Sequence, residues 1–402
     1  MAFTGVRSLN GGSTSKDVQG AWFLATVKHC YNSYEARLKM FDTSKRDMKR
    51  TVYVLGAGFC RDFNKTIFPL VCDFLSMAKS FNIYQPNGSH RELASFIYRY
   101  FGDEVFPDVE KVLSFLATTP FESLEVNFEK RSQLYDELVA NIVRMLTAAS
   151  ATVANMNGRD VWKLYSKFID HLIQSSATVL TFNYDLLLEE LLSATNLWQM
   201  YDGYGVDIPL IHNALPTPSF GEPLVADYRP RASRSNVILL KMHGSINWGI
   251  PIDQAKHLMD KGDLIYRLPE HGKSLAIDYF QLPAPDGLPL VMIFKPVIVP
   301  PVMDKSAWLQ NRTFRSIWNM ALRSLQEAGE ITFVGFSLPP TDFMADALFR
   351  QGRLGNTKDR ISVVAPNASE MKPRYEQLFG HNVNFIDKGF HGWCIDRFWQ
   401  SQ

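Results

Sequence analysis

The sequence predicts an α/β protein whose core is a doubly wound, mostly parallel sheet. Short runs of almost entirely apolar residues recur along the chain, and such runs are typical of strands that helices cover on both faces. Segments with helical patterns, such as 186–193 and 313–328, follow several of these runs, which favours right-handed crossovers between parallel strands. The predicted strands lie at residues 51–58, 177–183, 237–243, 291–299, 331–336, 361–365 and 383–386.

Further parts surround this predicted core. No strand pattern occurs between Asn82 and Ser176, where several stretches have helical spacing. Apolar residues at 19–50 also recur at helical spacing, and this segment either packs on the main body or contacts another subunit. Two stretches rich in proline, glycine and charge, 201–235 and 250–289, are predicted to be long loops, and loops of this length are usually functional lids, partner sites or mobile segments. The expected parts are an N-terminal extension at 1–50 that is disordered and then helical, a discontinuous core at 51–82 and 176–390, an all-helical insertion at 83–175 and a C-terminal tail at 391–402.

Composition and charge exclude several classes of protein. The formal net charge of +1 argues against a chain that coats nucleic acid, so we expect no direct nucleic-acid binding. No apolar run is long enough to span a membrane, and the polar residues 1–17 lack the apolar core of a signal peptide. The four cysteines are scattered, with no Cys-x-x-Cys pair, so we expect no zinc site and no disulfide scaffold. These features predict a cytoplasmic protein that does not bind a membrane.

A glycine-containing turn, GAGF at 56–59, follows the first predicted strand. Glycines at such a place let backbone N–H groups approach a phosphate at the start of a helix. The full G-x-G-x-x-G fingerprint of dehydrogenases is absent, because Arg61 occupies the position of the third glycine. The turn therefore has two interpretations, a purely structural tight turn or a phosphate-binding loop. Arg61 likewise has two candidate partners, a phosphate or the neighbouring Asp62.

Polar side chains follow the next two predicted strands. Asn183 and Asp185 end the second strand, directly before a helical pattern, and His243 ends the third. Each has a structural explanation on its own, since Asn and Asp are common helix caps and a lone His is often a satisfied structural residue. Their shared position favours function, because the carboxyl ends of parallel strands meet at the edge where such sheets bind ligands.

The later predicted strands end in similar segments. Gly335 and Ser337 follow one strand and are placed to lie against a ribose or a phosphate. Prolines then stop this strand, and Asp342 precedes the next helical pattern, where it is either a helix cap or a ligand-binding residue. Asn367 follows the next strand and either binds a ribose hydroxyl or makes a turn.

The chain carries, in this order, the segments GAGF (56–59), TFNYD (181–185), KMHGSINW (241–248), VPP (299–301), VGFSLPPTD (334–342) and VVAPN (363–367). This ordered set resembles the sirtuin-like family of bacterial antiviral NAD⁺ hydrolases, and the resemblance runs discontinuously from about residue 51 to 390. It implies a sirtuin-like, Rossmann-type core. Each motif alone is modest, whereas their joint order is specific. Compared with protein-deacylating sirtuins, the zinc module is missing, which counts against deacylation.

The resemblance implies that the chain cleaves NAD⁺ to nicotinamide and ADP-ribose, as an NAD⁺-depleting effector in antiphage defence. Asn183 would hold the ribose next to nicotinamide or the attacking water, Asp185 would contact the carboxamide, and His243 would act as general base. NAD⁺ is then the substrate, and no zinc takes part. The other residues expected to bind NAD⁺ are Gly56, Ala57, Gly58, Phe59, Gly335, Ser337, Asp342 and Asn367.

The resemblance also implies regulated assembly. Uncontrolled cleavage of NAD⁺ would drain a cell, so we expect a homo-oligomer with a separate regulatory partner, a HerA-type ATPase first and an Argonaute-like protein second. Three alternatives to hydrolysis stay open: a nucleotide-binding sensor without turnover, a protein deacylase and an NAD-dependent oxidoreductase. The missing zinc module disfavours the deacylase, and the incomplete glycine fingerprint disfavours the oxidoreductase.

Overall fold

The computed structural model describes residues 50–70, 72–80, 91–102, 107–118, 127–154, 156, 160–206, 208, 236–251, 266–267, 280–283, 289–292, 294–299, 308, 310–353 and 360–399. All of them belong to the larger of the chain's two units, 49–402. The helix predicted at 19–50 lies outside the described residues except for Arg50, as do most of the loops predicted at 201–235 and 250–289. Across the described helices, none combines the length and the apolar character that crossing a bilayer requires.

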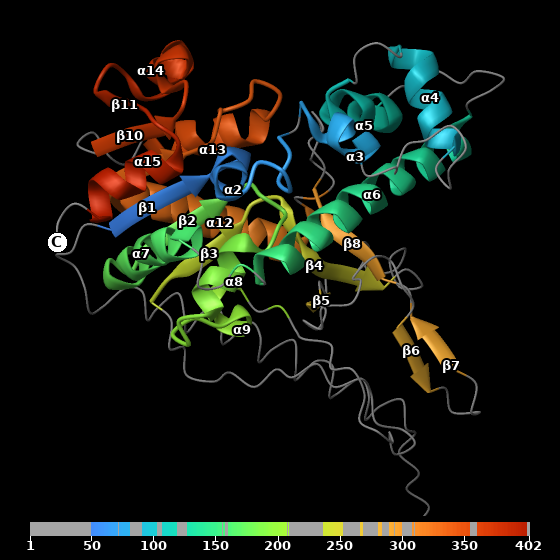
Figure 1. Ribbon diagram of the computed structural model, residues 1–402, viewed down its shortest axis with the longest axis horizontal. Coiled ribbons are helices and arrows are strands. Elements are labelled where there is room, and N and C mark those ends of the chain that lie inside the picture. The colour runs from blue at the N-terminus through green and yellow to red at the C-terminus, as the bar shows by residue number, and fades with distance from the viewer. Residues whose placement is uncertain are drawn as a thin grey trace, which may run out of the picture. The chain divides into compact units, whose positions relative to one another are not determined.

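Six parallel strands form the main sheet, in the order β11-β10-β9-β1-β2-β3 (Figure 1). The chain runs outward from β1 through β2 and β3, returns to the other side of β1 at β9, and continues through β10 to β11. This reversal makes the sheet doubly wound and confirms the predicted fold class, with the switch point between β1 and β9. The strands are β1 (Arg50–Leu55), β2 (Thr178–Thr181), β3 (Ile238–Lys241), β9 (Ala328–Val334), β10 (Arg360–Ala365) and β11 (Val383–Asp387).

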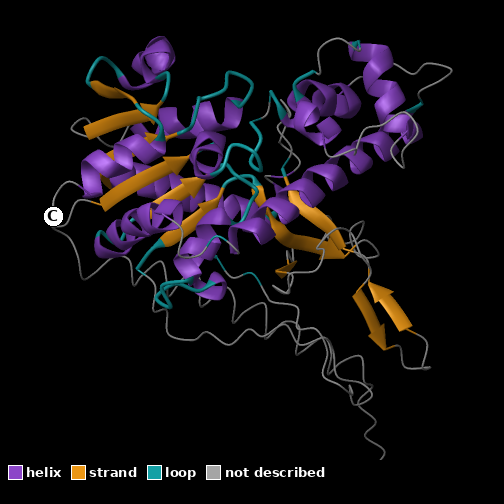
Figure 2. Cartoon of the chain, in the orientation of Figure 1, coloured by secondary structure: helices purple, strands orange, loops and turns teal. Residues whose placement is uncertain are grey.

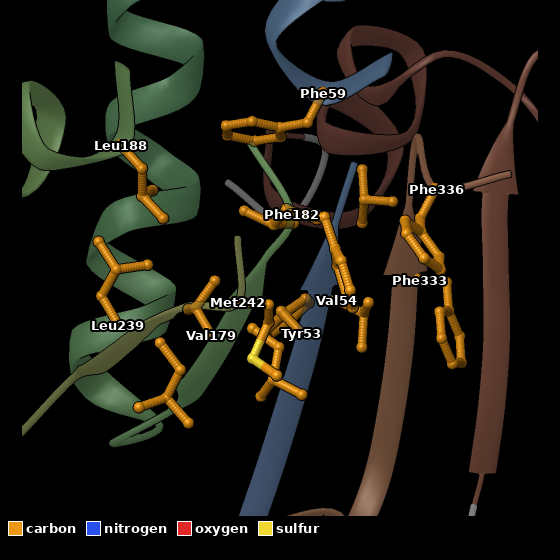
Figure 3. Close-up of a cluster of buried hydrophobic side chains, with 14 of the residues drawn as sticks. Tyr53, Val54, Phe59, Val179, Phe182, Leu188, Leu239, Met242, Phe333 and Phe336 are labelled. Carbon is orange, nitrogen blue, oxygen red and sulfur yellow. The ribbon is translucent and has the colours of Figure 1, made fainter. Parts of the chain in front are cut away.

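Helices cover both faces of this sheet, as the apolar runs predict. Tyr53 of β1 packs on Phe168 of α7 (Asp160–Gln174), with ring centroids 5.1 Å apart. The next residue, Val54, is in register with Phe333 of β9, so Phe333 faces the opposite side from Tyr53. Phe333 packs there on Tyr375 of α14 (Lys372–Phe379), at 5.0 Å. Figure 3 shows this buried layer, in which each fully buried large side chain stabilises the fold by about 1.5–3 kcal/mol.

The run predicted as a strand at 291–299 is not part of the parallel sheet. It forms the end of β7 (Pro289–Met292) and β8 (Phe294–Ile298), and β8 pairs antiparallel with β4 (Gly244–Pro251). Two turn residues, Met242 and His243, separate β3 from β4, and β4 takes β8 as its partner. Two short elements complete this region, β5 (Tyr266–Arg267) beside β4 and β6 (Phe280–Pro283) beside β7, where the sequence predicts only loops.

A second hydrophobic cluster belongs to the helices that follow α2 (Ala57–Phe63), and Figures 1 and 2 show these helices gathered away from the main sheet. The described residues between 83 and 175 are helical apart from short connections, as predicted. Leu186 before α8, Ile246 of β4 and Ile298 of β8 also belong to this cluster. The helices of the cluster are α3 (Phe74–Ser80), α4 (Arg91–Phe101), α5 (Val109–Thr118) and α6 (Phe128–Ala154), whereas α7 packs on the sheet.

The C-terminal tail predicted at 391–402 is largely structured. It forms α15 (Phe390–Cys394) and the π-helical turn η2 (Ile395–Trp399), and the ring of Phe390 lies 4.8 Å from that of Phe59 in α2. Trp393 is buried in the main core. The tail therefore supports the helix that follows β1. The remaining helices are α8 (Leu187–Ser193), α9 (Met200–Gly203), α12 (Arg312–Glu327), α13 (Phe343–Arg353) and the 3₁₀ turn η1 (Ala368–Met371).

Candidate functional site

Two glycine turns meet at the switch point, one after β1 and one after β9. The Gly56 amide donates to the Val334 carbonyl at 3.1 Å, and the Gly58 amide donates to the Gly335 carbonyl at 3.0 Å. Gly335 has a φ of +59°, and a Cβ on it would lie 2.4 Å from the nitrogen of Phe59. A Cβ on Gly56 would lie 2.5 Å from the Gly335 oxygen. Close packing of the two turns therefore requires glycine, and it occupies the amides of Gly56 and Gly58.

The Asn183 side chain lies against the first of these turns. Its amide nitrogen donates to the Gly56 carbonyl at 3.0 Å and to the Cys60 sulfur at 3.1 Å. Asn183 is therefore not a cap of the helix that follows. Asp185 accepts from the Cys60 thiol at 3.3 Å and from the Leu187 amide at 3.0 Å, so it does anchor the start of α8.

Cys60 is the central contact of this group, and the sequence analysis missed it. Burial, and next the negative charge of Asp185, raise the pKa of the Cys60 thiol well above its ordinary value. The neutral thiol links Asp185 to the Asn183 amide. Cys60 is the fourth residue of α2, which begins at Ala57 inside the GAG turn, so it lies one helical turn from the end of β1. That spacing was the signal available in the sequence.

His243 and Asp342 form a buried pair at the same edge. The Nε2 atom of His243 lies 3.0 Å from Oδ2 of Asp342, and the two side chains are 7% and 4% exposed. The other Asp342 oxygen accepts from the Ala345 amide at 3.2 Å and so caps α13. Gly244 allows the turn at His243, because its φ is +81° and a Cβ would lie 2.1 Å from the Val297 oxygen.

Aromatic rings enclose the His243 imidazole. The edge of the imidazole meets Phe182 at a centroid distance of 5.0 Å and an angle of 88°, and Tyr184 lies roughly parallel at 6.2 Å. Phe182 itself stacks on Phe336 at 4.5 Å (Figure 3). Burial, and next the charge of Asp342, raise the pKa of Tyr184, so its phenol stays protonated and donates to the Val299 carbonyl at 2.6 Å.

Three further predicted residues have their described contacts elsewhere. The Ser337 side chain is exposed at the end of β9, and its carbonyl accepts from Arg374. The Asn367 amide donates to the Glu370 carboxylate at 3.1 Å, beside η1. The Phe59 side chain points into the core. The structure thus brings together Gly56, Gly58, Gly335, Asn183 and Asp185 in one set of contacts and His243 with Asp342 in another. It shows no contact from Ser337, Asn367 or the Phe59 ring to Asn183 or His243 among the described residues.

Arg61 pairs with Asp73, and the Asp62 carboxylate accepts from the His391 amide. Asp62 is therefore not the partner of Arg61. Within the ranges that the structure covers, no three His, Cys, Asp or Glu side chains are grouped as a metal site would require. The expected absence of zinc remains a prediction.

No protein-family model and no curated protein matches the chain. Several solved structures of Sir2 homologues are similar to it. A Sir2 homologue in complex with NAD has 12% sequence identity and a TM-score of 0.40, covering 88% of this chain and 89% of that chain. A variant of a Sir2 homologue in complex with ADP ribose has 12% sequence identity and a TM-score of 0.40, covering 88% of this chain and 92% of that chain. Sir2Tm bound to a propionylated peptide has 11% sequence identity and a TM-score of 0.36, covering 91% of this chain and 97% of that chain. Similarity at this level does not assign the chain to a family.

Proposed function

We propose that the chain binds NAD⁺ and hydrolyses the bond between nicotinamide and ribose, giving nicotinamide and ADP-ribose. The observation that carries this proposal is the buried His243–Asp342 pair at the carboxyl edge of a doubly wound sheet, where Asn183 follows the strand next to that of His243. Ligands of such sheets bind at this edge. The motifs GAGF, TFNYD and VGFSLPPTD follow β1, β2 and β9 of this sheet, and their resemblance to sirtuin-like NAD⁺ hydrolases supplies the substrate class.

His243 is the general base of the proposed reaction. When Nε2–H donates to Asp342, the Nδ1 atom carries the lone pair that accepts a proton. The Asp342 carboxylate holds the ring in this tautomer and stabilises the imidazolium that forms, as the acid does in a catalytic triad. The proton comes from the attacking water or from a ribose hydroxyl, and it passes to solvent after nicotinamide has left.

Asn183 orients the other reactant. Because its amide nitrogen is bonded to the Gly56 carbonyl, its side-chain oxygen is directed by the fold and can accept from a ribose hydroxyl or from water. The nicotinamide bond breaks through an oxocarbenium-like state, in which placement of the water decides the rate. Asp185 contacts the carboxamide in this proposal.

Nicotinamide release from NAD⁺ by the purified chain tests the proposal. We expect His243→Ala and Asn183→Ala each to lower the turnover by about 100-fold or more, with unchanged circular dichroism. Matched controls are His381→Ala and Asn384→Ala, which replace exposed residues of the same types near β11. Wild-type turnover in either site variant would overturn the mechanism.

A nucleotide-binding sensor without turnover is the second candidate. One observation favours it, since Asn183 and His243 are only 9% and 6% exposed and both bond to neighbouring groups. A sensor would bind NAD⁺ without releasing nicotinamide, so calorimetric binding and product analysis on one sample separate the two functions. Adding an acylated peptide tests the deacylase alternative, which predicts a peptide-dependent release of nicotinamide.

Regulation forms the last part of the proposal and rests on the resemblance alone. We propose a cytoplasmic antiphage effector that forms a homo-oligomer and is controlled by a partner protein, a HerA-type ATPase or, second, an Argonaute-like protein. Light scattering measures the oligomer, and co-purification with each partner tests the assembly. A monomer that hydrolyses NAD⁺ at full rate at micromolar concentration would contradict this part.

A further inference from the structure

A buried ion pair lies directly behind the site. The Nζ atom of Lys241, the last residue of β3, is 3.0 Å from Oε1 of Glu189 in the first turn of α8. Both side chains are only 1% exposed. The Tyr204 hydroxyl donates to the same carboxylate oxygen at 3.1 Å, and Asn247 donates to that hydroxyl at 3.4 Å.

Stability does not explain this pair. Two charges removed from water lose hydration that their mutual attraction often fails to offset, and well-packed apolar replacements are often as stable. Burial raises the pKa of Glu189 above its ordinary value, although the charge of Lys241 acts to lower it. The loss of hydration therefore outweighs the attraction between the two charges. Moreover, the Oε2 atom of Glu189 has no hydrogen-bond partner in the described part of the chain, which adds a desolvation cost.

Lys241 makes a second contact that does point to a role. Its Nζ atom donates to the backbone carbonyl of Asp185 at 2.5 Å. Lys241 stands two positions before His243, and Asp185 stands two positions after Asn183. One ammonium group therefore ties together the two segments that carry the proposed reactive side chains.

Glu189 fixes the direction of that ammonium group. A lysine side chain has four flexible carbon–carbon bonds, so an unpaired ammonium has no single orientation. With Glu189 on one side and the Asp185 carbonyl on the other, Nζ is held between α8 and the end of β2. From Asp185 the constraint continues through the Cys60 thiol to the Asn183 amide.

We propose that Lys241 and Glu189 are positioning residues, which hold segment 183–185 in place against the turn that carries His243. The structural part of this proposal, that the two residues hold the segment in place, is argued from the contacts of Lys241 with Glu189 and with the Asp185 carbonyl. The catalytic part, that this placement raises the rate of NAD⁺ cleavage, rests on the proposed function.

The main test uses the double variant Lys241→Met/Glu189→Gln. It removes both charges together, keeps the side-chain volumes close to the originals and leaves an acceptor for Tyr204. Lys241→Met alone would bury the Glu189 carboxyl without its counter-ion. Glu189→Gln alone leaves the Lys241 ammonium without a counter-ion, but the isosteric amide oxygen and the Asp185 carbonyl still accept from Nζ. It serves as the second variant if the double variant does not fold.

The first measurement does not depend on NAD⁺. N-ethylmaleimide labelling of native protein, resolved by peptide mass spectrometry, reports how often segment 183–185 releases the Cys60 thiol. We expect Cys60 to label about tenfold faster in the double variant and more modestly faster in Glu189→Gln. Cys394, a fully buried thiol that bonds to the Leu164 carbonyl, is the internal control and should keep its rate.

An unchanged Cys60 rate in both variants would overturn the proposal. So would an equal rise at Cys60 and Cys394, because this would indicate a general loosening. Arg397→Met/Glu330→Gln removes a different ion pair, which spans 3.0 Å, and should leave the Cys60 rate at the wild-type value.

The second measurement is the steady-state kinetics of nicotinamide release. Misplaced reacting groups lower kcat, so we expect kcat to fall on the order of tenfold in the double variant with KM nearly unchanged. A raised KM with an unchanged kcat would overturn the catalytic part. Wild-type kinetics together with fast Cys60 labelling would overturn it as well. If the wild-type protein releases no nicotinamide, the proposed function fails, and Cys60 labelling still decides the structural part.

Discussion

The imidazole of His243 and the carboxylate of Asp342 meet at 3.0 Å, although the strands that precede them are not neighbours. His243 follows β3 and Asp342 follows β9, with β2 and β1 between them in the sheet. Strands at about 4.8 Å spacing separate these two strand ends by about 14 Å. The segment after β9 therefore reaches across the carboxyl ends of β1 and β2, and Phe336 stacks on Phe182 along the way. The pair thus connects the ends of two strands that are not neighbours in the sheet.

Asp342→Asn tests what this pair does. From the sequence, Asp342 is expected to bind NAD⁺, so its loss would mainly raise KM. Its contact with His243 leads to a different expectation, because an amide cannot hold the imidazole in one tautomer or stabilise its charged form. We expect kcat for nicotinamide release to fall on the order of 100-fold or more, with a small change in KM. Asp346→Asn, in the same helix and bonded to Arg350 on the surface, is the control. A raised KM with normal kcat would return Asp342 to a binding role.

Asn367→Ala is expected to behave in the opposite way. Asn367 bonds to Glu370 at the end of β10 and has no described contact with His243 or Asn183. If it binds the adenosine half of NAD⁺, its loss raises KM and leaves kcat nearly unchanged. The same steady-state assay measures both constants. Normal values of both would show that Asn367 only makes a turn.

The inner strands of the main sheet were predictable because burial on both faces leaves an unbroken apolar run. β1 and β2 show this directly, since their buried residues include consecutive positions such as Val52 to Leu55. The prediction that the apolar run at 291–299 belongs to the main sheet was wrong for a related reason. Apolar character indicates burial, but it does not identify the partner strand, and β8 pairs with β4 rather than with the main sheet. The turn into β4 requires Gly244, because an added Cβ would lie 2.1 Å from the Val297 oxygen, and the local sequence pattern does not show this tertiary contact.

The candidate site could be predicted where its residues follow strands, and it was missed at Cys60, which lies on a helix, and at Lys241, which is the last residue of a strand. Asn183, Asp185 and His243 stand at strand ends, where position alone suggests a ligand edge. Cys60 enters from the first helix, and Lys241 resembles the last residue of any strand. Only the three-dimensional structure shows that both bond to Asp185. The role of Asp342 was ambiguous in sequence because it is both a helix cap and the partner of His243.

Gly335→Ala is expected to destabilise the protein strongly. The residue has a left-handed φ of +59°, and an added Cβ would lie 2.4 Å from the Phe59 nitrogen. Left-handed strain and overpacking together cost about 3 kcal/mol. Gly380→Ala is a matched control, because its φ is +84° but nothing lies within 4 Å of the added carbon, and it should cost only about 1 kcal/mol. Thermal melting of both variants measures the difference. Equal losses would mean that the two glycine turns do not need their close approach.

His171 provides a prediction about pH. The Tyr53 hydroxyl and the His171 Nε2 atom are 2.9 Å apart, and burial raises the pKa of Tyr53, so the phenol stays protonated and donates. Burial, and next the charge of Arg397, lower the pKa of His171, while Glu330 opposes this. The folded protein therefore keeps His171 neutral at pH values where the unfolded chain already binds a proton. Between the ordinary value of 6.5 and the lowered one, the unfolded state holds more protons, so stability falls as the pH falls.

His171→Gln removes this titration and keeps an acceptor for Tyr53. We expect the melting temperature of the wild-type protein to fall more between about pH 7.5 and about pH 5.5 than that of the variant. Glu189, whose pKa burial raises, contributes to the pH dependence with the opposite sign. Its contribution is the same in both proteins and cancels in the comparison. His381→Gln, at an imidazole that is 89% exposed, is the control and should keep the wild-type pH dependence. Parallel melting curves for the wild-type and His171→Gln proteins would show that His171 does not titrate on unfolding in this range.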